Sequence, residues 1–300
     1  MAGYQSLEKL RSEVESARSI LQADTQSPLP IGIGYLGWQL EKPNTPAQQL
    51  LSVALDNKVQ AVWLSFGAQL QRWINFIRES EEHPGATKIF IQVTSLEEAL
   101  VAINTWKADV IVAQGIEAGG HGSSTSPPLL TLVSEILANL SEEGPPILGA
   151  GGLVNGGHIA ALLSLGASDS QRLALTSAGT GSSVRTMAFD HARNTLGWPR
   201  GIDGRGLRNS TVVDFENGVD IADLRRKYAD GVKVDDPDRI VIWAGAGVGL
   251  MNKIQPAKVR PPRTVFTIEF MYGMSTFQEI VEEIHGECVT HIQSVASMLQ

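Results

Sequence analysis

Short apolar runs alternate with amphipathic segments through the first half of the chain. The runs are rich in Val, Ile and Leu and end at glycine or polar residues, which is typical of strands buried in a parallel sheet. The segments between them repeat apolar side chains every three or four residues, as in helices that pack one face on a sheet. The pattern predicts strands at 30–36, 61–66, 88–93, 109–113 and 146–149, and helices at 6–21, 46–55, 69–79, 95–106, 129–140 and 155–165.

The alternation of these elements predicts an α/β fold with a parallel sheet, either open or closed into a barrel. Periodicity alone does not choose between the two. One helix start is well marked, because Ser95 stands in the N-cap position and Glu98 three residues later completes the sequence of a capping box.

The second half of the chain has a different character. It is rich in Ser, Thr, Gly and Arg, and it predicts only a short helix at 221–228, a strand at 240–244 and a C-terminal helix at 278–299. We therefore expect two parts, a (β/α) portion at 1–169 that carries the candidate chemistry and a following segment at 170–300.

The first candidate for chemistry is the segment VIVAQGIEAGGHG at 110–122. Its apolar start ends at Gln114, and the acid Glu117, two adjacent glycines and the imidazole of His121 follow. Glycines let the backbone approach a ligand closely, and an imidazole titrates near neutral pH. A strand that opens into such a loop is typical of α/β enzymes that present a proton-transfer group to a ligand.

A second glycine-rich element, PPILGAGGLVNGGHIAALLSLGA, occupies 145–167. Gly151 and Gly152 predict a tight turn after a strand, and Asn155 is the predicted N-cap of the next helix. Backbone N–H groups at such a turn and at a helix start suit a phosphate. Phosphates commonly bind after the last two strands of a (β/α)8 barrel.

These two segments, in this order and spacing, resemble the nitronate monooxygenase family, once called 2-nitropropane dioxygenases. AQGIEAGGHG resembles the family's histidine motif, and LGAGGLVNGGHIAALLSLGA resembles its flavin-phosphate turn. The stretches at 183–209 and 241–254 resemble the segments that follow the barrel. The resemblance implies a TIM-type (β/α)8 FMN barrel and FMN-dependent oxidation of nitronates or nitroalkanes by oxygen, to a carbonyl compound and nitrite.

His121 matches the family histidine that takes the α-proton of a nitroalkane or orients the nitronate, and it is the candidate catalytic residue. A histidine that merely caps the loop is the alternative interpretation. Glu117 could serve as an acid partner of His121, but we expect it to support the loop instead.

Five further residues are the flavin contacts that the resemblance implies. Gln114 and Gly119 match positions that touch the flavin ring or its chain. Gln92, at the end of its predicted strand, would point a polar group at the same mouth, or would be a solvated strand end. Gly151 and Gly152 would approach the phosphate, with a plain β-turn as the alternative.

The chain departs from the family pattern in three places. Its five predicted strands are three short of a barrel, and the family's first two strands have no counterpart before the helix at 6–21. The eighth strand and its phosphate turn are missing between Ser168 and Gln171, and 258–277 looks like an insertion. We hypothesise errors of the gene model: a truncated start, a skipped segment and a retained intron. A transcript that encodes this chain intact would contradict the hypothesis.

Composition limits the partners of this chain. With 24 basic and 32 acidic residues its net charge is −8, which argues against non-specific binding to nucleic acids or anionic membranes. The lone Cys288 cannot form an internal disulfide, and the histidines lack metal-ligand spacing, so we expect no metal. No apolar stretch is long enough to span a membrane. We expect a cytoplasmic enzyme that acts on a small molecule and oxygen.

Two other functions are compatible with the sequence. One is an FMN-dependent reductase of enoyl thioesters, which would require NAD(P)H. The other is an inactive remnant that holds no flavin, which would follow from the missing strands.

Two local patterns also have alternative interpretations. The glycines of VIWAGAGVGL at 241–250 suggest a dinucleotide loop, but their GxGxG spacing favours a glycine-lined wall beside the flavin. Arg185, Arg205 and Arg208 could steer an anionic nitronate or could form loop salt bridges, and we favour the salt bridges.

Overall fold

The computed structural model describes residues 5–24, 26–141, 143–164, 183–250, 286, 288–290 and 293–294. Among these residues the chain divides into two compact units: unit 1 holds 5–112 and 140–147, and unit 2 holds 113–139 and 148–250 with the few described residues after 250. The predicted boundary at 169, the gap at 168–171 and the insertion at 258–277 lie outside the described residues. The predicted C-terminal helix is described only at 286, 288–290 and 293–294, which are helical.

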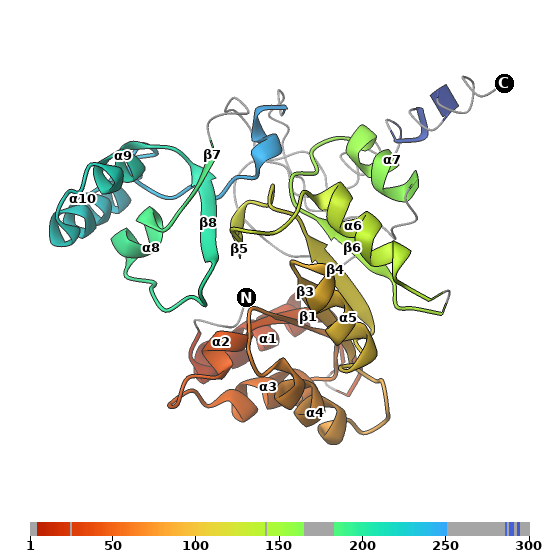
Figure 1. Cartoon of the computed structure of the whole chain (residues 1–300). Coiled ribbons are helices and arrows are strands. Elements are labelled where there is room, and N and C mark those ends of the chain that lie inside the picture. The colour runs from red at the N-terminus through yellow and green to blue at the C-terminus, as the bar shows by residue number, and fades with distance from the viewer. Residues whose placement is uncertain are drawn as a thin grey trace. The chain divides into compact units, whose positions relative to one another are not determined.

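Unit 1 is built from alternating helices and parallel strands, as the sequence predicts. Strands β1 and β2 pair in parallel, and so do β2 and β3, with Ile33, Val62 and Ile89 in line across the three. Helix α3 packs between α1 and α4 (Figure 1). The elements are α1 (Leu7–Ile20), β1 (Leu29–Leu36), α2 (Gly37–Leu40), α3 (Ala47–Asp56), β2 (Val59–Ser65), α4 (Leu70–Ser80), β3 (Lys88–Val93) and α5 (Leu96–Asn104).

Two side-chain hydrogen bonds fix the start of α5 next to Ser95, the predicted N-cap. The Ser95 hydroxyl accepts a hydrogen bond from the backbone N–H of Glu98 at 3.2 Å. The Glu98 carboxylate in turn accepts the N–H of Thr94 at 2.6 Å, one residue before the position expected in a capping box. The reciprocal cap is therefore present with its second bond shifted by one residue.

The parallel sheet has the strand order β1-β2-β3-β4-β6 in the described part of the chain. Strands β4 (Val110–Gln114) and β6 (Ile147–Ala150) continue the predicted alternation, together with α6 (Leu129–Ala138) and α7 (Gly156–Ser164). All five predicted strands and all six predicted helices of this half are confirmed to within two residues at each boundary. Among the described residues, no helix combines the length and apolar character needed to cross a membrane.

A second, antiparallel sheet with the order β5-β8-β7 lies in unit 2, and the sequence did not predict it. Its strands are β5 (Gly120–Ser123), β7 (Ser183–Thr186) and β8 (Ile202–Leu207), and the helices α8 (Ala188–Arg193), α9 (Ser210–Glu216) and α10 (Ile221–Lys233) accompany it. The predicted strand at 240–244 is wrong. Only an isolated bridge between Trp243 and Gly206 forms there, and the 3-10 helix η2 (Ala246–Leu250) follows.

The pleat of the antiparallel sheet places His121 on one face and Arg185 and Arg205 on the other. Residues that face each other across antiparallel strands share one side of the sheet, and successive residues alternate sides. His121 is paired with Gly204, whereas Arg205 is paired with Gly120 on one side and with Arg185 on the other. The His121 side chain and the two arginines therefore project from opposite faces.

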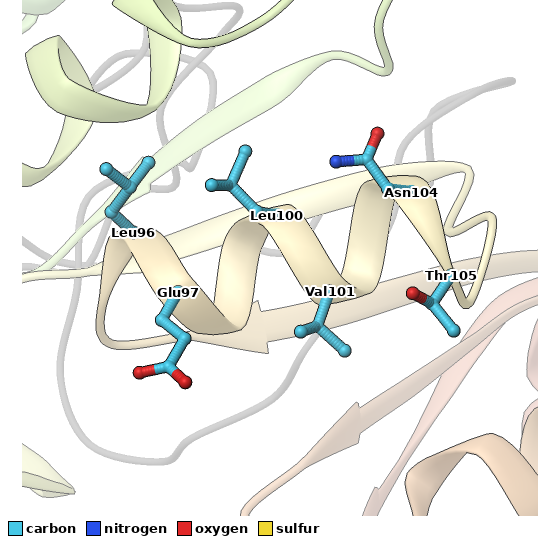
Figure 2. Close-up of a pocket in the computed structure, with 6 residues that line it drawn as sticks. All are labelled: Leu96, Glu97, Leu100, Val101, Asn104 and Thr105. Carbon is cyan, nitrogen blue, oxygen red and sulfur yellow. The ribbon is translucent and has the colours of Figure 1, made fainter.

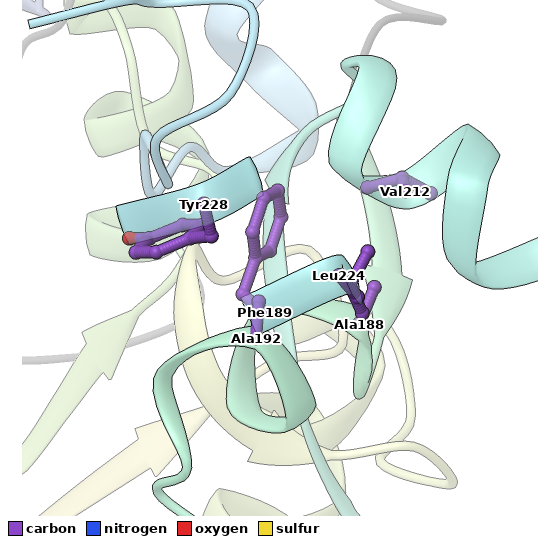
Figure 3. Close-up of a cluster of buried hydrophobic side chains, with 6 residues drawn as sticks. All are labelled: Ala188, Phe189, Ala192, Val212, Leu224 and Tyr228. Atoms are coloured by element: carbon purple, nitrogen blue, oxygen red, sulfur yellow. The ribbon is translucent and has the colours of Figure 1, made fainter. Parts of the chain in front are cut away.

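The face with His121 is covered by an apolar cluster (Figure 3). Val184 and Trp243 pack at the edge of this cluster. Gly206 makes room for it, because an added Cβ would lie 3.1 Å from the ring of Phe189. The buried members come from α8, α9 and α10: Ala188, Phe189, Ala192, Val212, Leu224 and Tyr228.

Neighbouring valines in α9 test this packing directly. Val212 is fully buried in the cluster, whereas Val213 is 41% exposed. We expect Val212→Ala to lower the free energy of unfolding by about 2 kcal/mol, because it removes buried methyl groups and leaves a cavity. Val213→Ala shares the change in helix propensity and should stay within about 0.5 kcal/mol of the wild type. Urea unfolding of both variants measures the difference, and equal losses would contradict the assigned packing.

Candidate active site

His121 is held by a buried carboxylate from α8. Its Nε2 atom lies 3.0 Å from both Oδ1 and Oδ2 of Asp190, and Asp190 is fully buried. Strand β5 places the histidine and α8 places the acid, although 69 residues separate them in the chain. Because a buried polar group without partners is costly, this contact ties the histidine loop to the α8 segment.

Asp190 accepts two further hydrogen bonds. The Thr195 hydroxyl donates to Oδ1 at 2.8 Å, and the indole N–H of Trp198 donates to the same oxygen at 3.2 Å. Three donors converging on one carboxyl group fit its ionised, acceptor-only form. Nε2 of His121 is the ring nitrogen that faces this carboxyl group.

Two tryptophans enclose the imidazole. The Trp198 ring stacks on His121 at a centroid distance of 3.7 Å and an angle of 11°, and Trp243 meets it edge-on at 5.0 Å. Gly204 in β8 makes this possible, because an added Cβ would lie 2.5 Å from the Trp243 ring. The His121 side chain keeps 13% of its surface exposed, so the ring is oriented on several sides and still reachable.

The loop that carries His121 is supported by polar contacts at both ends. Gln114 closes it, because its side-chain N–H donates to the backbone oxygen of His121 at 3.1 Å. The Glu117 carboxylate accepts the backbone N–H of Leu129 at 3.0 Å, in the first turn of α6. Glu117 thus supports the loop, as expected, while Asp190 holds the place of the acid partner.

The predicted flavin glycines pack closely against the chain. An added Cβ at Gly119 would lie 2.7 Å from the backbone nitrogen of Gly245. Gly151 and Gly152 have φ angles of +111° and +70°, and added Cβ atoms there would meet Ala118 and Glu117. These positions require glycine for the turn and for this close packing, and their contact with a phosphate stays a prediction.

The structure places five of the six predicted site residues in unit 2 and the sixth in unit 1. His121, Gln114, Gly119, Gly151 and Gly152 all belong to unit 2. Gln92 lies near the end of β3 in unit 1, so its place beside the others stays a prediction.

A surface hollow lies along helix α5 (Figure 2). It has a volume of about 590 Å³ and is lined only by side chains of α5 and the residue after it, including Leu96, Leu100 and Val101. None of the predicted site residues lines it, so it adds nothing to the chemistry around His121.

The sequence pattern did not indicate that Asp190, Trp198 and Trp243 surround His121. One signal was available for the acid, since Asp190 stands among Ala188, Phe189 and Ala192, where a carboxylate needs buried partners. Its partner in β5 could not be read from that pattern, because it is remote in the sequence.

Comparison with known proteins decides the family. The profile of the nitronate monooxygenase family matches residues 2–259. The chain belongs to the nitronate monooxygenase family. It is 31% identical over 278 residues to the nitronate monooxygenase npaC of Metarhizium robertsii, covering 83% of this chain and 76% of that protein. It is 28% identical over 289 residues to a nitronate monooxygenase of Neurospora crassa, with 85% and 76% covered.

Solved structures agree on the fold of this nitronate monooxygenase family member. FabK from Thermotoga maritima matches with a TM-score of 0.67 at 20% identity, covering 99% of this chain and 86% of that one. Nitroalkane oxidase from Streptomyces ansochromogenes matches with a TM-score of 0.58 at 20% identity, with 96% and 78% covered. The fold is thus the TIM-barrel type of α/β fold, of which the described residues hold five parallel strands.

Nitronate monooxygenases are flavin enzymes, and the donors in unit 2 fit such a cofactor. The loop and the turn place glycines and the Gln114 amide close together. On the opposite sheet face, Nε of Arg205 is buried and has no hydrogen-bond partner among the described residues, as suits a place where an anionic group binds. These residues are compatible with a flavin that carries a phosphate.

Adjacent glycines in the histidine loop offer a test of its packing. Gly119→Ala forces a methyl group onto the backbone of Gly245, so we expect it to lower the free energy of unfolding by about 1–3 kcal/mol. The φ of Gly120 is +71°, but an added Cβ there meets no atom within 4 Å. Gly120→Ala should therefore cost only the strain of its backbone, about 1 kcal/mol. Thermal and urea unfolding measure both variants, and a larger cost at Gly120 would contradict the packing.

Proposed function

We propose that this chain oxidises nitronates, or the nitroalkanes that give rise to them, with bound FMN and oxygen, and releases a carbonyl compound and nitrite. The observation that carries the proposal is the His121–Asp190 pair in the loop that bears the family's histidine motif. A histidine with one nitrogen bound to a buried carboxylate has the orientation and the protonation state of a general base.

The proton acceptor in this proposal is Nδ1 of His121. Asp190 holds the Nε2 proton, so the lone pair of Nδ1 is free to take the α-proton of a nitroalkane. Removal of that proton leaves the electron pair of the broken C–H bond in the nitronate anion, and the imidazolium that forms is stabilised by the adjacent carboxylate. Trp198 and Trp243 keep bulk water from most of the ring.

FMN supplies the redox chemistry when it is bound, because it accepts electrons from the substrate and passes them to oxygen. We propose that Gln114 and Gly119 contact the flavin ring or its chain and that Gly151 and Gly152 approach its phosphate. Gln92 would reach the same mouth from β3. At 20% identity, the likeness to FabK shows the fold alone and does not favour a reductase. We therefore expect the chain not to oxidise NADH under nitrogen.

The first measurement is the visible absorption spectrum of the purified full chain, before and after FMN is added and the excess is removed. We expect the two absorption bands of oxidised flavin to stay with the protein. A chain that remains colourless after FMN is added would overturn the proposed enzyme and leave the flavin-free remnant as the better description.

Nitrite release from propane-2-nitronate and from 2-nitropropane tests the base. We expect His121→Ala to lower kcat with 2-nitropropane by about 10²- to 10⁴-fold, while the preformed nitronate, which has already lost its α-proton, is affected less. Asp190→Asn should lower the same rate by at least about 10-fold, because it weakens the hold on the Nε2 proton.

Controls separate chemistry from folding and cofactor loss. His83→Ala changes an exposed histidine of unit 1 and should leave the rate unchanged. Flavin content is measured for every variant, so that a lost cofactor is not mistaken for a lost base. Wild-type rates in His121→Ala at full flavin content would rule out the assigned base.

A further inference from the structure

The three arginines of the basic cluster differ sharply in their partners. Arg185 donates from Nε to Asp203 at 2.6 Å and from Nη2 to the backbone oxygen of Gly122 at 2.6 Å. Arg208 forms a two-point ion pair with Glu216. In the described part of the chain, the Arg205 side chain forms no hydrogen bond or ion pair, and its Nε is buried.

Arg205 is held in a position that disfavours its charge. Arg185 lies directly opposite it across β7 and β8, and like charges in such pairs repel. Burial lowers the pKa of the Arg205 guanidinium, and the charge of Arg185 lowers it further, against opposing effects of Asp203 and Glu117. A buried guanidinium nitrogen without a hydrogen-bond partner in the described part of the chain is explained best by a partner that the chain itself does not supply.

The surroundings of Arg205 leave room for such a partner. Its neighbour across β5 is Gly120, and a Cβ added to Gly120 would meet no heavy atom of the described residues within 4 Å. Opposite residues share one side of a sheet, so this open position lies on the same face as the guanidinium. The backbone of Arg205 also accepts the N–H of Ala244, next to Gly245, which packs on Gly119.

We propose that Arg205 binds an oxyanion group of a ligand on the sheet face opposite His121. A guanidinium presents a planar fork of donors, and its charge-assisted hydrogen bonds match the oxygens of a phosphate monoester or of a planar carboxylate or nitronate. The two possible sources are the phosphate of FMN, which rests on the proposed function, and a free anion, which does not.

Binding of defined anions to the full chain tests the site without any assay of activity. The primary variant is Arg205→Met, which keeps the length of the side chain and removes its donors. The matched control is Arg208→Met, which removes an exposed arginine that already has a partner. The probes are inorganic phosphate, isobutyrate, FMN and riboflavin, all at constant ionic strength.

We expect Arg205→Met to weaken binding of its anion by roughly 10- to 100-fold, as the loss of hydrogen bonds to a charged group does, and Arg208→Met to leave it unchanged. Weaker binding of inorganic phosphate and FMN with unchanged riboflavin assigns the site to the cofactor phosphate. Weaker binding of isobutyrate with unchanged FMN and riboflavin assigns it to a planar two-oxygen anion. Identical affinities of Arg205→Met and wild type for all four probes would overturn the proposal.

Stability without the anion gives a second, independent readout. Replacing an unpartnered, half-buried cation by an apolar side chain should leave Tm unchanged or raise it in phosphate-free buffer. A purely structural arginine predicts the opposite, and a marked fall in Tm would therefore count against the proposal. Arg205→Gln is the alternative should Arg205→Met aggregate. Absence of nitrite release alone would reject the proposed function and leave these binding results intact.

Discussion

A carboxylate with no access to water organises unit 2. Asp190 can be buried only because an imidazole, a hydroxyl and an indole donate to it. These donors come from β5 and from the loop after α8, so the need to satisfy one charge joins segments that are remote in the sequence. The orientation of the His121 ring beside Trp198 follows from this single requirement.

The two faces of strand β8 carry different kinds of side chain. Its glycines at 204 and 206 open space for aromatic rings on the face of His121, while Asp203 and Arg205 project from the other face. The base proposed at His121 and the anion site proposed at Arg205 thus lie on opposite faces of one sheet.

The sequence predicted the parallel part of the fold well and the antiparallel part poorly, for physical reasons. In strand β4 three consecutive residues, 111–113, are buried, and such an apolar run is visible in the sequence alone. Strand β8, with the sequence IDGRGL, has few side chains of high β-propensity, and its partners are supplied by tertiary contacts. In the strand predicted at 240–244, Val241 and Trp243 pack on the cluster around Phe189, and only an isolated bridge to Gly206 forms.

The candidate base was found from its motif, but its acid partner was not, since a hydrogen bond across 69 residues leaves no local trace. The bond from Leu129 to Glu117 has a related consequence for motion. A helix whose first turn is capped by a side chain from the histidine loop cannot keep that cap when the loop opens. Loop 115–122 and the first turn of α6 should therefore gain and lose order together, as one cooperative unit.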